Sequence, residues 1–507
     1  MRRMRPTERA CVIGALAVCQ AAAGGGFEGF APPVTYSVGD NPLAVAAGDI
    51  DNNGTADLAI ANEDDNTVSV LFGLGDGTFA PPATLSTTEN PIDVRLSDID
   101  NDGNLDLVVL SEFVAALDTQ GAISVHLDQD GLFAPPTVYR MRTFSTVFEL
   151  IDLNGDGLED AVTADGSDGT VSVRLGNADG TFGARLDYPA GLTPRALALG
   201  DVTGDGVPDV VVNSGQFTPR YYVLAGLGDG TLGAPQFFTV PSAVYDLALA
   251  DLNGDGLLDF LGGTGSQQVH VRLGIAGGDF APAETLTFDG AGSISDLLCI
   301  DLNGDSFVDI AAPDLVGVVL TRLGNGDGTF QAHQPYACGS FPASITYADF
   351  DGNVSPDLVV PNPGSDHINV LINQASFPPG AFALLAPADG AQGLPLPEAV
   401  AGWSPAALRW KASTSFPTYR VEIATDSEFL ATVFDTHGVS GTSVDVPLGV
   451  LAPSTRYYWR VTASTAGGDT ASTPAYATFT TTQAADLNSD GVIDATDLAA
   501  LIAFWSP

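Results

Sequence analysis

A nine-residue acidic segment recurs seven times in this chain, at intervals of 48 to 54 residues. We call each copy a ladder, and the ladders begin at Asp49, Asp98, Asp152, Asp201, Asp251, Asp301 and Asp349. Asp occupies the first and ninth positions of every ladder, and Asp, Asn or Thr occupies the third and fifth. A repeat of this length is typical of a solenoid or a propeller and argues against a single compact core.

Short β-type segments surround each ladder in the same order. In the first copy they are residues 42–47 before the ladder, then 57–62 and 67–71 after it, followed by a Gly-rich turn over 73–79. Asp-Gly pairs in such turns are strong hairpin signals. Four short antiparallel strands per repeat of this length predict a propeller blade. We therefore expect an all-β fold with a seven-bladed β-propeller over residues 24–375.

The ring of blades needs a closing strand. The last repeat has a third strand near residues 368–372 but no good fourth strand. Residues 30–38, before the first ladder, resemble the fourth strands elsewhere, because Phe30-Ala31-Pro32-Pro33 matches Phe79-Ala80-Pro81-Pro82. We predict that this N-terminal strand completes the seventh blade and covers its edge.

The oxygen-bearing positions of the ladders predict a cation site in each blade. Hard cations such as Ca²⁺ take six to eight oxygen ligands, and a backbone carbonyl at position seven explains why that residue varies so widely. Mg²⁺ keeps more of its waters, and no ladder contains the His or Cys that softer metals prefer. Because Asp, Asn and Gly also favour turns, plain polar turns are the alternative, which seven copies in register disfavour.

The predicted propeller ligands are the residues at positions one, three, five, seven and nine. They are Asp49, Asp51, Asn53, Thr55 and Asp57; Asp98, Asp100, Asp102, Asn104 and Asp106; Asp152, Asn154, Asp156, Leu158 and Asp160; Asp201, Thr203, Asp205, Val207 and Asp209; Asp251, Asn253, Asp255, Leu257 and Asp259; Asp301, Asn303, Asp305, Phe307 and Asp309; and Asp349, Asp351, Asn353, Ser355 and Asp357.

The repeats resemble the FG-GAP/VCBS repeats of integrin-alpha-like propellers, through the ladder, Phe72-Gly73 and Gly233-Ala234-Pro235. The resemblance implies Ca²⁺ in each loop and a role in adhesion or recognition. Ser306 and Val354 replace the sixth-position Gly of the last two ladders. We expect those two sites to bind more weakly or to adopt another loop shape.

After a linker at 376–380 the repeats stop. Residues 381–483 contain spaced β-type segments with different sequence patterns, which fits a two-sheet sandwich. This segment resembles a fibronectin type III domain through Trp410 and the pattern of Leu451, Tyr457 and Trp459. Such domains usually act as spacers or in interactions. We expect the Trp side chains here to belong to the core rather than to a ligand platform.

Residues 484–507 predict a calcium loop followed by a short helix, similar to one type I dockerin repeat. The ligands implied are Asp486, Asn488, Asp490, Val492 through its carbonyl, Asp494 and Asp497. Dockerins normally carry two repeats and bind cohesin modules of extracellular polysaccharide-degrading assemblies. With one repeat, a cohesin-like partner, a calcium-stapled tail and a surface-retention signal all stay open.

The first 23 residues are typical of an export signal, with a basic start, a short apolar run and a small-residue stretch at residues 21–23. The apolar run is about half the length that a membrane-spanning helix needs, roughly 20 residues, and no other segment could span. We therefore expect a secreted or surface protein without a transmembrane segment. Cys299 and Cys338 are expected to be lone buried thiols rather than a disulfide pair.

The formal charge of −44 excludes nucleic acid as a partner, because such a surface repels phosphates. No nucleophile elbow, phosphate-binding loop or zinc-protease motif occurs, and the five histidines are scattered, so we expect no enzyme. The sequence predicts a monomeric, calcium-stabilised protein for adhesion or for extracellular protein or glycan interaction. A carbohydrate-binding lectin and an accessory component of a polysaccharide-degrading system are the alternatives.

Overall fold

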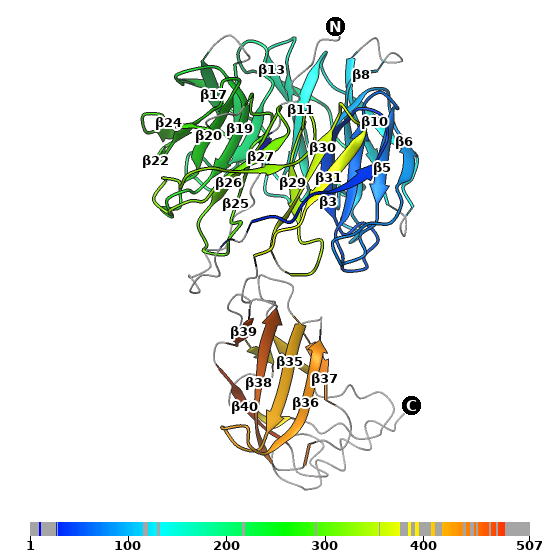
Figure 1. Cartoon of the computed structure of the whole chain (residues 1–507), viewed down its shortest axis with the longest axis vertical. Coiled ribbons are helices and arrows are strands. Elements are labelled where there is room, and N and C mark those ends of the chain that lie inside the picture. The colour runs from blue at the N-terminus through cyan, green and yellow to red at the C-terminus, as the bar shows by residue number, and fades with distance from the viewer. Residues whose placement is uncertain are drawn as a thin grey trace. The chain divides into compact units, whose positions relative to one another are not determined.

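A computed structural model describes most of residues 29–375 and parts of 384–481 (Figure 1). The described ranges are 10–11, 27, 29–114, 120–128, 132–214, 219–288, 292–353, 355–375, 384–386, 391–394, 407–410, 418–439, 443–446, 451–452, 455–465, 468–472 and 475–481. The chain divides into two compact units, one ending at Ala375 and the other beginning at Ser376. No helix in these ranges is long and apolar enough to cross a membrane.

The first unit contains seven sheets of four antiparallel strands, one of which has an additional short parallel strand, so the predicted all-β propeller is confirmed. The first strands of the seven blades are β3 (Pro42–Gly48), β7 (Pro91–Ser97), β11 (Ser145–Ile151), β15 (Leu197–Gly200), β19 (Val244–Ala250), β25 (Leu298–Ile300) and β29 (Thr346–Ala348). Six of the seven pairs of neighbouring first strands contact each other, which places these strands around the centre of the ring.

The second strands follow the ladders directly and are buried along their whole described length. They are β4 (Asp57–Asn62), β8 (Asp106–Val114), β12 (Asp160–Asp165), β16 (Asp209–Asn213), β20 (Asp259–Thr264), β26 (Asp309–Asp314) and β30 (Asp357–Asn362). Every one begins at the ninth Asp of its ladder. The apolar residue after that Asp, for example Leu58 or Phe260, enters the core.

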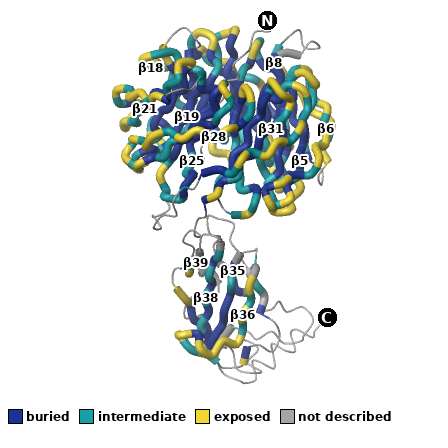
Figure 2. Tube along the Cα trace, in the orientation of Figure 1, coloured by how far each residue is buried: buried dark blue, intermediate teal, exposed yellow. Residues whose placement is uncertain are grey.

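The third and fourth strands form the outer half of each blade. The third strands are β5 (Thr67–Leu71), β9 (Gln120–His126), β13 (Thr170–Arg174), β17 (Arg220–Leu224), β21 (Gln268–Arg272), β27 (Val318–Arg322) and β31 (His367–Leu371). The fourth strands are β6 (Ala83–Ser86), β10 (Thr137–Arg140), β14 (Leu186–Pro189), β18 (Gln236–Thr239), β24 (Glu284–Thr287), β28 (Gln334–Ala337) and β2 (Val34–Ser37). Figure 2 shows buried residues following the inner strands, while exposed residues gather on the outer strands and loops.

The N-terminal strand closes the ring as predicted. In Figure 1 the blue β2 lies beside the yellow β31, and the two pair antiparallel with Val34 opposite Val370. A backbone hydrogen bond from Ala31 to Ile372 and a bridge between Phe30 and Asn373 extend this pairing. Phe27 and Phe30 pack edge-on against Tyr336 of the sixth blade, which anchors the start of the strand.

Two short pairs lie outside the blades. The hairpin of the fifth blade contains β22 (Gly274–Ile275) and β23 (Asp279–Phe280). The two-residue β1 (Ala10–Cys11) pairs parallel with β19. Because β1 lies within the predicted export signal, which remains a prediction, removal of that signal would leave the fifth blade with four strands.

The second unit is a β-sandwich. One sheet contains β32 (Leu384–Ala386), β34 (Ala407–Trp410) and β37 (Ser443–Asp445). The other contains β33 (Ala391–Leu394), β40 (Ala477–Thr481), β38 (Arg456–Thr465), β35 (Thr418–Ala424) and β36 (Thr432–Val439), with β39 (Gly468–Ala471) beside β38. Trp459 is fully buried, and the Ala452 N–H donates to the Tyr457 hydroxyl at 2.6 Å, the tyrosine corner of such sandwiches.

The core prediction for Trp459 is therefore confirmed, whereas the side chains of Trp403 and Trp410 lie outside the described residues. The predicted tail over 484–507, with its calcium loop and helix, also lies outside them. Cys299 and Cys338 are both buried and form no disulfide with each other, as predicted.

Candidate metal sites

The ninth-position Asp is the most constrained residue of each ladder. All seven are fully buried at the start of the second strand. One carboxylate oxygen accepts the backbone N–H of position two at 2.8–3.0 Å. The other accepts an N–H just after the third strand at 2.7–2.9 Å. This Asp therefore ties the ladder to the outer half of its blade.

The loop of each ladder folds around the carboxylate of the first-position Asp. In Asp251, one oxygen accepts the N–H of Gly254 at 2.8 Å and the other accepts the N–H of Gly256 at 2.9 Å. The N–H of position six donates in the same way in every other ladder where that residue is described. The N–H of position four does so in the other ladders with Gly there, whereas in the first two ladders the N–H of Asn53 or Asp102, at position five, takes its place. The backbone thus curls around this carboxylate and leaves the third and fifth side chains on the surface of the loop.

Left-handed backbone makes the curl possible at positions four and six. Position four is Gly in five ladders and Asn52 or Asn101 in the others, all with φ between 57° and 76°. Asn tolerates this region better than other side chains do. The expected loop shape rested on the sixth-position Gly alone, although the recurring Gly or Asn at position four was a signal for a second bend.

The sixth ladder keeps the common loop shape despite Ser306. Ser306 adopts a φ of 70°, and its N–H donates to Asp301 at 2.8 Å, as Gly256 does to Asp251. The expectation of another loop shape is therefore wrong for this ladder, because the hydrogen bond to Asp301 holds a Ser in the conformation of Gly. Val354 of the seventh ladder lies outside the described residues, and weaker ion binding by both remains a prediction.

Three ladders bring three carboxylates together. The groups are Asp49, Asp51 and Asp57; Asp98, Asp100 and Asp106; and Asp349, Asp351 and Asp357, each with ligand oxygens within 4.8 Å of one another. These ladders have Asp at position three, where the other four have Asn154, Thr203, Asn253 or Asn303. They belong to the seventh, first and second blades, which are neighbours across the closure of the ring.

In the ladders with Asn at position three, amide and carboxylate are paired instead. The Asn253 side chain donates to Asp255 at 3.0 Å and accepts the Asp255 N–H at 2.9 Å. Asn154 with Asp156 and Asn303 with Asp305 do the same. The loop is thus already folded around oxygen atoms, which reduces the reorganisation that a cation would require.

Burial without an ion raises the pKa of the ninth Asp. Loss of solvation is the largest cause, hydrogen bonds from the backbone oppose it, and neighbouring ladder carboxylates add to it. The pKa rises to about 6 for Asp106, Asp160 and Asp259 and to about 8 for Asp309 and Asp357. A cation would favour the charged form that burial disfavours.

Neighbouring ladders also contact each other around the ring. The Asn52 side chain donates to Asn104 of the next ladder at 2.8 Å. The N–H of Gly77, in the hairpin of the first blade, donates to Phe350 of the seventh ladder at 2.9 Å. These contacts link neighbouring blades through their ladders.

Buried polar residues at the opposite end of the second strand were not predicted from the sequence. Five residues after each ninth Asp stands Asn62, Ser111, Asp165, Ser214, Thr264, Asp314 or Asn362, and all seven are buried. Asp165, for example, accepts hydrogen bonds from the hydroxyls of Ser145, Thr163, Thr170 and Ser172. Their fixed spacing from the ladder was the signal that could have revealed them.

Comparisons with known proteins agree with the propeller repeats. Residues 49–109, 152–212 and 251–312 match the FG-GAP-like repeat, and residues 193–237 match the FG-GAP repeat. Residues 400–484 match the Rha78A-like N-terminal immunoglobulin domain, so the comparison supports a sandwich but names an immunoglobulin rather than a fibronectin type III type. No curated protein sequence matches this chain.

Two solved structures are similar to this chain, both described as BBS1N in complex with ARL6DN. The crystal soaked with lead is 13% identical, with a TM-score of 0.49, and the match covers 71% of this chain and 99% of that one. The crystal soaked with mercury has the same identity and TM-score, over 68% and 98%. The first unit of this protein is a propeller that carries FG-GAP-like repeats, which are typical of extracellular or surface proteins.

Proposed function

We propose that this protein is a secreted interaction protein in which each ladder binds Ca²⁺ as a structural staple of its blade. The observation that carries the proposal is the convergence of three carboxylates within 4.8 Å in three ladders. Charges this close repel one another, and a hard cation with oxygen ligands removes that repulsion. Ca²⁺ suits these all-oxygen loops better than Mg²⁺, which retains its waters.

Linkage gives such ions a large structural role. If free Ca²⁺ exceeds the dissociation constant tenfold, each site adds about 1.4 kcal/mol to the free energy of unfolding. Seven sites would add roughly 10 kcal/mol, which is comparable to the stability of a whole domain. Dissociation constants near 10⁻⁴ M, common in extracellular modules, would be sufficient outside the cell.

A role in binding rather than catalysis forms part of the proposal. The first and ninth ladder carboxylates are engaged by backbone N–H groups, which makes them poor general acids. The Ser242 hydroxyl lies 2.7 Å from His270, whose other ring nitrogen contacts Thr285. His270 is buried, burial lowers its pKa, and no carboxylate contacts it within the described residues, so it is weakly suited to activate a serine.

The FG-GAP repeats support an extracellular adhesion or interaction role. The export signal, the C-terminal calcium loop and the monomeric state belong to the same proposal. Glycan binding and a link to polysaccharide degradation have no support from the described residues beyond the sequence patterns given above.

Calcium removal tests the proposal directly. Full-length protein stripped of metal should unfold at a temperature about 10 °C or more below that of the same protein in millimolar Ca²⁺. Mg²⁺ at the same concentration should restore much less. Metal analysis should find about seven ions in the propeller. An identical melting temperature with and without Ca²⁺ would remove the basis of the proposal.

A further inference from the structure

The connections that enter the blades contain strained residues at one repeated position. Eight residues before a ladder stand Asn41, Asn90, Phe144, Thr193 and Phe341, all with φ between 50° and 59°. The carbonyls of Asn41, Asn90 and Phe144 accept equivalent N–H groups, which confirms the correspondence. Asn tolerates left-handed backbone, but Phe and Thr do not, and such strain concentrates at functional sites.

Two of these strained residues belong to one continuous surface on the third and fourth blades. Phe144 is 41% exposed, and its carbonyl accepts the N–H of Gly166, which lies against Pro194. Leu192 is 70% exposed and directly precedes the strained Thr193. Gly191 lies against the ring of Tyr222, so the two connections and the fourth blade touch one another.

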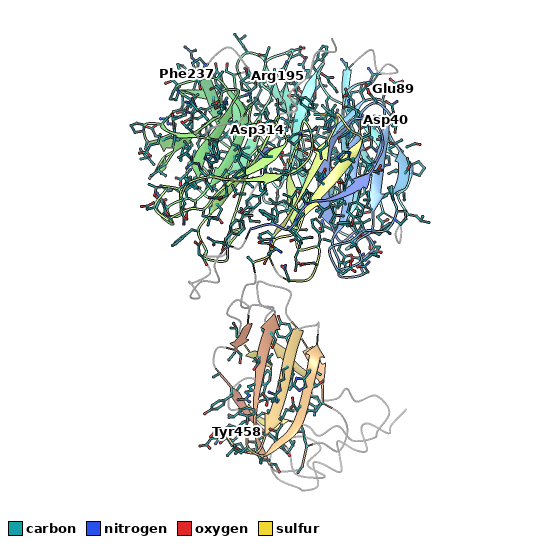
Figure 3. The ribbon with its side chains drawn as sticks, in the orientation of Figure 1. Asp40, Glu89, Arg195, Phe237, Asp314 and Tyr458 are labelled. Atoms are coloured by element: carbon teal, nitrogen blue, oxygen red, sulfur yellow. The ribbon has the colours of Figure 1, made fainter. Side chains whose placement is uncertain are left out.

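The same surface continues onto the outer strand of the fourth blade. Tyr222 of β17 lies opposite Phe237 of β18, with ring centroids 6.3 Å apart. Phe237 is 56% exposed, and the Arg220 guanidinium lies 4.8 Å from its ring centroid. Figure 3 shows Phe237 and Arg195 at the same end of the propeller as Asp40 and Glu89. We call Phe144, Leu192, Arg195, Arg220, Tyr222 and Phe237 the blade-4 surface.

The charge of the blade-4 surface is opposite to that of the rest of the protein. Among the described residues, neither Arg195 nor Arg220 forms an ion pair. Between residues 188 and 245 the only acidic residues are Asp201, Asp205 and Asp209 of the ladder and Asp229 of the hairpin, all at the ladder end. In the third blade, the nearby Asp168 and Asp187 both pair with Arg142. The corresponding end of the first blade instead carries Asp40, Asp65 and Asp366 close together.

We propose that the blade-4 surface binds an acidic segment of a partner protein. Carboxylates of that segment pair with Arg195 and Arg220, and an apolar side chain of it packs against Leu192, Tyr222 and Phe237. Arginine and aromatic residues together are the composition of energetically dominant interface residues. Attraction between unlike charges on an otherwise acidic protein restricts the choice of partner and its orientation. This inference rests on the proposed interaction function and specifies its partner.

An acidic polysaccharide fits this surface less well. Sugars present many hydroxyl groups, and a site for them needs several fixed hydrogen-bonding side chains. The blade-4 surface offers two guanidinium groups, one phenol and three apolar side chains. A protein segment with carboxylates and one large apolar residue matches that set.

The test uses full-length protein in Ca²⁺ and phage-displayed random peptides as the probe. We expect the selected peptides to share Asp or Glu residues beside a Leu or aromatic residue. A synthetic peptide with the shared sequence should bind the R195S/R220S variant at least about tenfold more weakly than the wild type. Its affinity should also fall as salt concentration rises.

Two matched variants separate binding from folding. F144N places at this position the residue found in the first and second blades, so the melting temperature should be unchanged or higher while peptide affinity falls about fivefold. F341N removes the same strain in the seventh blade, outside the blade-4 surface, and should leave the affinity unchanged.

Three results would overturn the inference. They are a selection without acidic peptides, equal affinity of the peptide for R195S/R220S, and equal losses of affinity in F144N and F341N. Polygalacturonate serves as the comparison ligand. If it binds the wild type in an Arg195- and Arg220-dependent manner and the peptides do not, the surface recognises an acidic glycan instead. If one of these results is obtained while the melting temperature still depends on Ca²⁺, the blade-4 surface is ruled out and the proposed function stands.

Discussion

The seven blades are more alike at one end of the propeller than at the other. At the ladder end, seven blades repeat the same Asp residues, the same backbone hydrogen bonds to the ninth Asp and nearly the same φ angles. The far end is where the second strand turns into the third and where the fourth strand leads to the next blade. There the buried position five residues after the ninth Asp holds Asn, Ser, Asp or Thr. The same four-stranded sheet supports both.

The two ends differ because the ladder end is suited to one repeated ligand and the far end is not. A common ligand demands a common set of atoms, so a uniform ladder end fits seven copies of one cation site. The far end has no such shared demand, and each blade satisfies its buried polar groups with its own partners. Differences between blades at the far end can therefore carry individual functions, as proposed for the blade-4 surface.

The largest expected effect is a pH dependence that comes mainly from the ladder end, although burial also raises the pKa of Asp165 and Asp314 at the far end. Without Ca²⁺, the raised pKa values of the ninth Asp residues mean that the folded state binds protons more tightly than the unfolded state. Stability of the metal-free protein should therefore be highest at acidic pH and fall as the pH rises from about 4 to about 8. Ca²⁺ needs the charged carboxylates, so its benefit should grow over the same range.

Thermal melts at pH 5 and pH 8, with and without Ca²⁺, measure this effect. The shift in melting temperature caused by Ca²⁺ should be at least about twice as large at pH 8 as at pH 5. A calcium shift independent of pH would mean that the ninth Asp carboxylates do not take part in binding the ion.

A single ladder separates the structural role of Asp from its role toward the ion. D160A removes the acceptor of two buried N–H groups, those of Leu153 and Gly176, and should cost about 2–5 kcal/mol even without Ca²⁺. D156A changes an exposed residue of the same ladder and should cost less than about 1 kcal/mol without Ca²⁺.

Urea denaturation of both variants with and without Ca²⁺ makes the distinction. In Ca²⁺ the deficit of D156A should grow by about 1.4 kcal/mol, the contribution of one site at tenfold saturation. Equal deficits of D156A in both conditions would argue that the fifth position binds no ion and that the ladder is a hydrogen-bonded turn alone.

The far end should resist exchange of residues between blades. N62D gives the first blade the residue that the third blade carries as Asp165. Asp165 has four hydroxyl donors, whereas Asn62 contacts only the hydroxyls of Thr67 and Ser69 and lies near Asp65. A buried charge with fewer donors should cost N62D about 2–3 kcal/mol at pH 7.

The reverse exchange is the control. D165N removes a charge, and its four hydroxyl partners can rotate to meet an amide, so the cost should be about 1 kcal/mol or less. Urea midpoints at pH 7 compare the two. Similar costs would show that the far end is as interchangeable as the ladder end.

The difference between the two ends explains which features of the structure could be predicted from the sequence. The ladders repeat in register, so the blade count, the closing strand and the buried ninth Asp could all be predicted. The hydrogen bonds of that Asp could not, because they join residues about sixteen positions apart, such as Asp57 and Gly73. The hydrogen bonds of Arg272 could not be predicted either, because they depend on the packing of two blades. Arg272 donates to Ala281 and Phe280 of its own blade and to Thr239 of the blade before it. Arg174 and Arg322 occupy the equivalent position and also donate to their own blade and to the blade before it. Leu71 and Leu224 stand there in other blades, so the pattern recurs in only some of the repeats.

The smallest expected effect tests strain at the far end without the blade-4 surface. Phe341 has a φ of 57° and its ring lies against Gly364, so F341N exchanges one apolar contact for a residue that tolerates left-handed backbone. Relief of strain should outweigh the contact with a half-exposed ring and raise the free energy of unfolding by about 1 kcal/mol. F341G, measured beside it, should gain less, because glycine loses more backbone entropy on folding. If both variants are less stable than the wild type, the Phe341 ring contributes more through packing than its backbone costs. Strain could then no longer single out Phe144 and Thr193 among the connections of the far end.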